Sequence, residues 1–425
     1  MRHREQVGIE KVNAVSGKAP EEAEARGLAP ETAIPDTMEK TIASPPAVWQ
    51  ESIAKTVTFV VTEDCQLRCR YCYLVGKNSR NRMGFDVARR SIDYIMENRD
   101  LFPERSIVWD FIGGEPFLEI DLMEEICGYV TKKLSDERHP WRDSHRFSVT
   151  TNGILYGTDK VQDFIRRYRP HLSVGVTIDG TPRKHNMHRV YPSGKGSYDD
   201  TARNIPLWLE QFPVASTKVT VASDDLPYVK ESVLHLYSIG IRHISINVVF
   251  EDVWKEGDDA VLEEQLVALA DFIIAEELYR EHTCSFFSES IGRPRRDNNN
   301  WCGAGRMLAI DHRGDFYPCH RFTPFSLANR KFPPLGNCFD GIDRNRLRPF
   351  LSLDLVSQSP RECIDCPVAT GCAWCQGANF DCARTDTIYE RATHLCRMHR
   401  ARVRANNYYW HKLRSALEVN AGGSP

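Results

Sequence analysis

The sequence lacks a long apolar run, a large excess of charge of one sign and an apolar N-terminus. No stretch approaches the roughly 20 apolar residues that a membrane helix needs, so we expect no membrane partner. The net charge of −3 gives no basic footprint, which argues against nucleic acid as the main partner. Because the first residues also lack the apolar core of a secretion signal, we predict a cytoplasmic protein.

Large apolar residues are also scarce in the first fifty residues, which are rich in Ala, Glu, Pro and Lys. Such a segment cannot bury enough surface to fold alone, so we expect residues 1–50 to be a disordered tail. Elsewhere a sizeable core is possible, because 41% of the 425 residues are hydrophobic. We predict one domain over residues 54–290, a second over 300–412, and a flexible C-terminus over 413–425.

Cysteine, by contrast, is plentiful, with fourteen residues in a chain that carries no export signal. Three of them, Cys65, Cys69 and Cys72, are spaced C-x3-C-x2-C, and Tyr71 directly precedes the third. Three thiolates this close together can hold three irons of a cubane cluster, which leaves the fourth iron open. A zinc site is the alternative, although zinc usually pairs C-x2-C with a second pair of ligands.

Segments with strand and helix patterns alternate between residues 56 and 279, which indicates βα units and a parallel sheet. Six such units fall short of the eight of a closed barrel, so we predict an open α/β barrel, a partial (β/α)6 TIM barrel. The cysteines follow its first strand. The expected strands are 56–62, 106–112, 146–150, 171–178, 216–222 and 243–250, and the expected helices are 85–95, 122–134, 161–168, 202–211, 226–239 and 262–273.

Glycines and polar residues follow the second, third and fourth predicted strands. Glycine lets the backbone approach a ligand closely, and a carboxylate there can accept hydrogen bonds from an ammonium group. Taken singly, each motif is equally explained as an ordinary turn or a surface group. The candidate binding residues are Gly113, Gly114, Glu115, Pro116, Thr151, Asn152, Asp179 and Arg189.

Four motifs, taken in order, resemble the signature of the radical SAM enzymes. They are the cysteine motif, Gly-Gly-Glu-Pro, Thr-Asn-Gly, and the Asp-Gly segment that is followed by His185 and Arg189. The resemblance implies a [4Fe-4S] cluster on Cys65, Cys69 and Cys72, whose open iron binds S-adenosyl-L-methionine (SAM). It also implies that the Glu115 segment holds the amino group of SAM. Thr151 and Asn152 would lie on the ribose and substrate side.

The C-terminal third is similar to the SPASM extension of that family, including Gly314, which is followed by four residues and then Cys319. It departs in one place, with two residues instead of three between Cys372 and Cys375. The resemblance implies two auxiliary [4Fe-4S] clusters, and two structural zinc ions are the alternative. The implied ligands are Cys302, Cys319 and Cys375 for the first cluster, and Cys363, Cys366, Cys372 and Cys396 for the second.

Four cysteines fall outside these ligand sets. Cys127, Cys284 and Cys338 are expected to be buried thiols, and Cys382 is a spare ligand.

Within the family, segments 61–65, 109–117, 247–254 and 371–377 resemble peptide maturases whose precursors carry repeated Cys-x-x-x motifs. The resemblance implies thioether formation started by a 5′-deoxyadenosyl radical. The implied partners are a cysteine-containing precursor peptide and a reduced flavodoxin or ferredoxin-type electron donor. The N-terminal segment is too polar to be the winged-helix module that many such enzymes use to bind a leader peptide.

Three alternatives stay open. One is a carbon–carbon cross-linking or epimerising maturase, and another is a sulfatase-type formylglycine maturase. In that second branch an Asp follows the second SPASM cysteine, whereas His320 stands there in this chain. The third is an iron–sulfur electron-transfer protein, against which the Gly-Gly-Glu-Pro segment argues.

Overall fold

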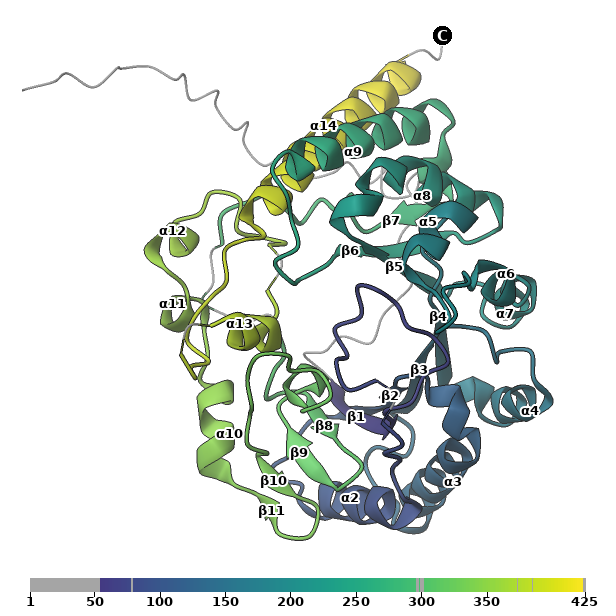
Figure 1. The fold of residues 1–425 in the computed structure, drawn as a ribbon, viewed down its shortest axis with the longest axis vertical. Helices are drawn as coiled ribbons and strands as arrows, with labels where there is room; N and C mark the ends of the chain where they lie inside the picture. The colour runs from purple at the N-terminus through teal and green to yellow at the C-terminus, as the bar shows by residue number, and fades with distance from the viewer. Residues whose placement is uncertain are drawn as a thin grey trace, which may run out of the picture.

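The computed structural model describes residues 54–422 except for 78, 296, 297, 299–301, 373 and 384. The predicted tail over residues 1–50 lies outside the described residues. Strands form an arc with helices on its outer side, and the C-terminal segment lies across the open side of the arc (Figure 1). No helix in the described residues is both long and apolar enough to cross a membrane. The prediction of an open α/β barrel is confirmed.

Six parallel strands and their helices build the barrel. The strands are β1 (Ala54–Thr62), β2 (Ser106–Gly113), β3 (His145–Thr151), β4 (Leu172–Val176), β5 (Ser216–Val221) and β6 (His243–Val248). The α-helices are α2 (Phe85–Glu97), α3 (Ile120–Asp136), α4 (Asp159–Tyr168), α5 (Pro182–His188), α6 (Tyr198–Ala202), α7 (Ile205–Gln211), α8 (Val229–Ser238) and α9 (Asp258–Ala275). Short 3-10 helices are η1 (Pro116–Glu119), η2 (Arg169–His171), η3 (Ser223–Tyr228) and η4 (Leu278–Arg280).

The C-terminal part contains short strands and helices. The strands are β7 (Thr283–Cys284), β8 (Leu308–Ile310), β9 (Asp315–Tyr317), β10 (Gly336–Asn337) and β11 (Gly341–Ile342). The helices are η5 (His320–Phe322), α10 (Arg344–Leu351), α11 (Leu355–Gln358), α12 (Arg361–Ile364), α13 (Gln376–Cys382) and α14 (Cys396–Gly422).

Strand β1 is central because it is β-branched and buried along almost its whole length. It pairs in parallel with β2, where Val57 lies opposite Trp109, and with β8, where Val57 lies opposite Leu308. The eight-stranded sheet therefore runs β11-β10-β9-β8-β1-β2-β3-β4. The predicted boundary near residue 300 thus does not separate two sheets, because the C-terminal strands extend the barrel sheet.

Strands β4 and β5 are joined by hydrogen bonds of a side chain instead of a ladder of backbone hydrogen bonds. Strands β5, β6 and β7 form a separate three-stranded sheet. The Thr217 hydroxyl of β5 donates a hydrogen bond to the carbonyl of Val176 at 2.7 Å and accepts one from the amide of Ile178 at 3.3 Å. The barrel wall therefore stays continuous across the break.

Two predicted helices are each divided in the structure. Segment 202–211 overlaps α6 and α7, and segment 226–239 overlaps η3 and α8. Pro227 lies inside η3, which ends where the regular helix begins.

The chain end also differs from the prediction. Helix α14 runs on to Gly422, where a flexible end was expected from residue 413. Leu413 is fully buried, because α14 lies beside α9 (Figure 1).

Candidate active site

The loop after β1 and the loop after β2 are in direct contact. The amide of Gly114 donates to the carbonyl of Thr62 at 3.0 Å, and the amide of Glu115 donates to the carbonyl of Asp64 at 2.9 Å. A Cβ on Gly114 would lie 2.1 Å from the Asp64 oxygen and 2.8 Å from the Cβ of Cys65. Glycine is required at residue 114 because its backbone lies against the cysteine loop.

Glu115 is a buried carboxylate with hydrogen-bond donors but no cationic partner. It accepts from the Thr151 hydroxyl at 2.7 Å, the Asn152 amide at 2.9 Å and the Phe117 amide at 3.1 Å. Burial raises its pKa to about 7 despite these hydrogen bonds. Among the described residues no lysine or arginine pairs with Glu115. An ammonium ligand would fit this site, because it would compensate a carboxylate that is otherwise buried without an opposite charge.

Three thiols lie in the loop between β1 and α2, and we call Cys65, Cys69 and Cys72 the barrel cysteine group. Burial raises the pKa of Cys65 to about 12, and the charges of Glu115 and Cys69 add to this effect. The Asn152 amide nitrogen is 4.0 Å from the Cys65 sulfur. Predicted residues from the ends of β1, β2 and β3 are therefore collected at one edge of the barrel.

The cysteine loop is tied to the segment after α5. The amide of Arg68 donates to the carbonyl of Val190 at 2.7 Å, and that of Arg70 donates to the carbonyl of His188 at 3.0 Å. The Tyr71 ring lies on the His188 ring, with centroids 4.9 Å apart. The loop conformation is thus held by backbone bonds on both sides of Cys69.

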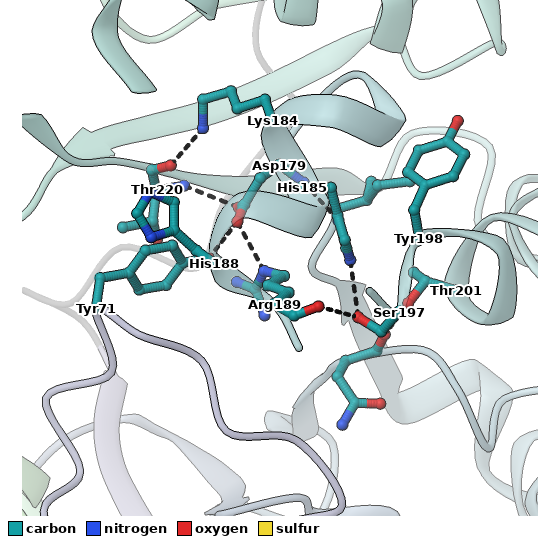
Figure 2. Close-up of polar contacts among 12 residues, drawn as sticks. Tyr71, Asp179, Lys184, His185, His188, Arg189, Ser197, Tyr198, Thr201 and Thr220 are labelled. Atoms are coloured by element: carbon teal, nitrogen blue, oxygen red, sulfur yellow. Dashed lines mark hydrogen bonds and ion pairs between the residues drawn. The ribbon is translucent and has the colours of Figure 1, made fainter. Parts of the chain in front are cut away.

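Asp179 lies at the centre of a buried polar network (Figure 2). Its carboxylate accepts hydrogen bonds from the Tyr71 hydroxyl, from Arg189 Nε at 2.8 Å and from the Thr220 amide at 3.1 Å. Burial alone raises the pKa of Asp179, but the charges of Arg189 and Lys184 and the hydrogen bond from Tyr71 together outweigh burial and hold the pKa below its usual range. The guanidinium of Arg189 also lies 5.6 Å from the centre of the Tyr71 ring. The network joins the cysteine loop to β4 and β5.

A second layer of buried charges supports this network. Lys184 Nζ pairs with Asp225 at 3.1 Å, and both side chains are fully buried. Lys184 also donates to the carbonyl of Thr220 at 2.7 Å. His185 Nε2 is 3.0 Å from the Ser197 hydroxyl, and burial lowers the pKa of His185 to about 3, which keeps its ring neutral. The sequence motif pointed to His185, but nothing in it distinguished Lys184 from a surface lysine.

The other predicted ligands form two groups in the C-terminal part. We call Cys302, Cys319 and Cys375 the first C-terminal cysteine group. The Gln376 amide donates to the Cys302 sulfur at 3.2 Å. Burial raises the pKa of Cys319, and the charges of Cys302 and Cys375 raise it further, which indicates that the three sulfurs are close together.

The second C-terminal cysteine group consists of Cys363, Cys366, Cys372 and Cys396. Burial is the main cause that raises the pKa of Cys372, and the charges of Cys396 and Cys366 raise it further. Burial likewise raises the pKa of Cys363, with a further contribution from Cys396 and Cys372. Arg391 Nη2 donates to the Cys372 sulfur at 3.3 Å. These interactions place the four cysteines near one another, and their role as ligands of one cluster stays a prediction.

The donor sets fit iron–sulfur clusters in chemistry, because such clusters are ligated by Cys thiolates. All fourteen cysteines lie among the described residues, and none of them forms a disulfide. The ligand sets that the resemblance implies are therefore not taken up by disulfides.

The remaining cysteines lie apart from these groups. Cys127, Cys284 and Cys338 are buried, as predicted. Cys338 packs beside Gly314 and interacts with Ser91 of α2. Cys382 is exposed at the end of α13.

No sequence pattern predicted the contact that joins the barrel part of the site to its C-terminal part. Tyr73 directly follows Cys72 in the chain, and the Arg321 guanidinium lies 4.2 Å from the centre of its ring. Amides of residues 75 and 76 donate to the carbonyl of Phe325 at 3.0 and 3.4 Å. The cysteine loop therefore rests on the C-terminal part as well as on the barrel.

Lys218 is another residue that sequence patterns did not single out. Its neighbours on β5, Thr217 and Val219, are buried, whereas Lys218 is exposed and alternates to the inner side of the barrel wall. Desolvation lowers its pKa, and the cations Arg189 and Arg321 lower it further, so its exposed surface faces a crowded lumen. Alternation along the strand is the signal that would have found it.

An open parallel barrel that gathers thiols and a buried carboxylate at its C-terminal edge defines a cofactor-dependent barrel enzyme. Residues 59–232 match the sequence profile of the Radical SAM superfamily. This part of the chain is therefore a radical SAM domain.

Two curated relatives and one solved structure are similar to this chain. The subtilosin biosynthesis protein AlbA of Bacillus subtilis is 25% identical over 280 residues, which are 64% of this chain and 56% of AlbA. The serine-type anaerobic sulfatase-maturating enzyme of Bacteroides thetaiotaomicron is 24% identical over 346 residues, or 72% of this chain and 78% of the relative. The structure of anSMEcpe with bound AdoMet and Cp18Cys peptide has a TM-score of 0.62 at 18% identity, covers 86% of this chain and 99% of that chain, and supports the fold alone.

Proposed function

We propose that this chain is a peptide maturase that joins the sulfur of a precursor cysteine to a carbon through a thioether bond. The observation that carries the proposal is the Tyr73–Arg321 contact. It links the loop of the barrel cysteine group to the segment that follows Cys319 in the first C-terminal cysteine group. Similarity to AlbA, named for bacteriocin biosynthesis, and to a fold solved with a bound peptide supports a peptide substrate.

The barrel residues would bind and orient SAM. The barrel cysteine group would hold a [4Fe-4S] cluster, and Glu115 would bind the amino group of SAM. Arg189 contacts Asp179 through Nε, and no described residue accepts from its terminal nitrogens, which leaves them for an anionic group. Thr151 and Asn152 hold the Glu115 carboxylate in place. A reduced cluster with bound SAM supplies a 5′-deoxyadenosyl radical.

Thioether formation breaks one C–H and one S–H bond and forms one C–S bond. The hydrogen atom goes to the 5′-deoxyadenosyl radical, the thiol proton is released, and one electron would pass to the oxidised cluster that the first C-terminal cysteine group would hold. The first C-terminal cysteine group has three thiols, so a cluster there would keep one position for the precursor sulfur. A metal-bound thiol is deprotonated, which would hold the sulfur as a thiolate near the barrel.

The test has two stages. The reconstituted protein, reduced by dithionite or by a flavodoxin- or ferredoxin-type donor, is mixed with SAM and assayed for 5′-deoxyadenosine. Synthetic peptides with Cys-x-x-x repeats are then added, and mass spectrometry follows the loss of two hydrogens and one alkylatable thiol per bridge. Absence of 5′-deoxyadenosine would refute the SAM site. Its formation together with a modified peptide that keeps every thiol would refute thioether formation.

Formylglycine maturation is a second candidate, favoured by the sulfatase-maturating relative, whereas His320 stands where that branch is expected to have an Asp. This histidine follows Cys319, and burial lowers the pKa of its ring to about 3, so it is neutral. Its Nδ1 is buried and has no hydrogen-bond partner in the described part of the chain. Because burial disfavours the protonated ring, His320 is a weak base at the place where related maturases are expected to use a carboxylate. Conversion of a substrate Ser or Cys to an aldehyde, detected by hydrazide labelling, would select this candidate.

A further inference from the structure

Beside each C-terminal cysteine group an arginine is stacked on an aromatic ring. Arg321 lies 4.2 Å from the centre of the Tyr73 ring, and Arg391 lies 4.6 Å from that of Trp374. Stacking holds a guanidinium in place without neutralising its charge. The proposed function gives neither arginine a chemical role, since it uses the Tyr73–Arg321 contact only as a link between the two halves of the site.

Arg321 is fixed against the first C-terminal cysteine group from three sides. Its Nη2 pairs with Glu251 Oε1 at 2.7 Å, and its side chain is 12% exposed. A Cβ on Gly377 would be 2.5 Å from the Cβ of Arg321, so the segment that begins at Cys375 lies directly on this arginine. The positive charge acts on the thiols of Cys319 and Cys375.

Arg391 has the corresponding place at the second group. Its Nη2 is 3.3 Å from the Cys372 sulfur, and its Nη1 is 3.3 Å from the Ser359 hydroxyl. Its charge also acts on Cys363. In the described chain no carboxylate pairs with Arg391, whereas Glu251 partly compensates Arg321.

We propose that Arg321 and Arg391 are positioning residues that set the reduction potentials of the two auxiliary iron–sulfur sites independently of each other. The inference rests on the part of the proposed function that assigns clusters to the two groups. Reduction adds an electron to a cluster, and a fixed cation beside its sulfurs stabilises the reduced form, which raises the potential. Each arginine contacts one group, so each should act on one potential.

The experiment is an EPR-monitored redox titration of the reconstituted full-length protein. The signal that changes on addition of SAM belongs to the barrel cysteine group, and the two others belong to the auxiliary sites. We expect Arg321→Gln to lower one auxiliary midpoint by at least about tenfold in the reduction equilibrium constant, or 59 mV for one electron. Arg391→Gln should lower the other midpoint by a similar amount.

Three further variants give the sign and the specificity. Glu251→Gln removes the anion beside Arg321 and should raise the midpoint that Arg321→Gln lowers. Arg321→Lys keeps the charge and should restore most of the wild-type value. Arg344→Gln is the matched control, since Arg344 is an exposed arginine of α10 that pairs with Asp100, and it should move no midpoint.

Unchanged auxiliary midpoints in Arg321→Gln and Arg391→Gln proteins with wild-type iron and sulfide content would overturn the inference. If Arg321→Gln fails to assemble, Glu251→Gln decides the first site, because its side chain is 41% exposed and its removal should not disturb folding. A wild-type protein that shows only the SAM-responsive signal would overturn this inference and the auxiliary-cluster assignment together. Three signals without 5′-deoxyadenosine would refute the proposed function and leave the titration decisive.

Discussion

The barrel cysteine group and the C-terminal cysteine groups are held by different kinds of interaction. On the barrel side, backbone hydrogen bonds from Arg68 and Arg70 fix the loop, and Tyr71 donates to Asp179. Asp179 is itself paired with Arg189 in a fully enclosed site. Displacing any part of this network exposes a buried charge to solvent or leaves it without its partner. These costs favour one arrangement of the loop.

The C-terminal groups rest on short helices and packed rings instead. Phe322, just after Cys319, lies 4.9 Å from the ring of Phe332, 5.2 Å from that of Phe350 and 5.6 Å from that of Phe380. Arg321, stacked on Tyr73, and Arg391, stacked on Trp374, provide positive charge near the sulfurs. The geometry there depends on apolar packing, and each group depends on few polar contacts.

The difference separates two tasks. A site that must present an open iron to SAM needs fixed geometry, which buried polar networks provide. A site that exchanges electrons needs a tuned potential, which one nearby charge can provide. Variants on the barrel side should therefore fail by loss of chemistry or folding, and variants on the C-terminal side should change the properties of a protein that still folds.

The largest expected effect comes from replacing Cys65, Cys69 and Cys72 by Ala together. SAM cleavage should be abolished, because no thiolates remain to hold its cluster. Iron bound to the two C-terminal groups should stay in place. Iron and sulfide analysis combined with a 5′-deoxyadenosine assay tests both statements, and undiminished cleavage would contradict the assignment.

The contact between Gly114 and the cysteine loop gives the next largest effect. We expect Gly114→Ala to reduce SAM cleavage on the order of 100-fold, because its Cβ would meet the Asp64 carbonyl and displace Cys65. Gly84→Ala is the control, since nothing lies within 4 Å of a Cβ there. Rates measured at saturating SAM, with iron content checked in each variant, decide the outcome. Equal rates for the two variants would show that the close approach has no functional importance.

Much of the barrel was predictable because its strands and helices follow simple periodicities. The predicted strand 106–112 differs from β2 by one residue, and strand 56–62 lies inside β1. The motifs at the strand ends also fall at one edge of the sheet, as parallel strands require. Asp179 and Arg189 were predicted to bind the cofactor, and the structure adds that they bind each other and Tyr71, which no spacing reveals.

The C-terminal part was less predictable for a physical reason. Cysteine spacing predicted which thiols group together, yet most of the strands there have only two or three residues and carry no periodicity. The pairing of Leu308 with Val57 depends on contacts across the whole chain, which local patterns do not encode. Arg321 and Arg391 were equally hidden, because a stacked arginine near a thiol resembles a surface arginine in sequence.

The Asp179–Arg189 pair should contribute more to stability than an exposed pair of the C-terminal helix. Asp179→Ala leaves a buried guanidinium without its partner, so we expect a loss of about 3–5 kcal/mol in the free energy of unfolding. Asp271→Ala breaks the exposed pair with Lys412 and should cost about 0–1 kcal/mol. Urea unfolding at pH 7 measures both.

The same pair predicts a pH dependence. The pKa of Asp179 is lowered in the folded state, so its contribution to stability is present above the unfolded pKa, about 3.9, and is lost as pH falls toward the folded value. Unfolding curves between pH 5 and pH 3 should therefore fall more steeply for the wild type than for Asp179→Ala. Parallel slopes would show that Asp179 is not held as a paired carboxylate.

The smallest effects should come from replacing Cys338 and Cys382, two of the cysteines outside the groups. These variants decide whether the first C-terminal cysteine group has three thiols or four. Cys338 packs beside Gly314, so Cys338→Ala should cost about 1 kcal/mol by leaving a small cavity. Helix α13 starts just after Cys375 and ends at Cys382. Its seven residues place Cys375 and Cys382 about 10 Å apart along the helix axis. Cys382→Ala at this exposed position should change stability by less than about 0.5 kcal/mol. Both variants should keep the wild-type iron content, because Cys382 lies at the far end of α13 and Cys338 packs against Gly314 and interacts with Ser91. Loss of one cluster's iron in either variant would mean that a fourth protein ligand closes the site, and the position kept for a precursor thiolate would not exist.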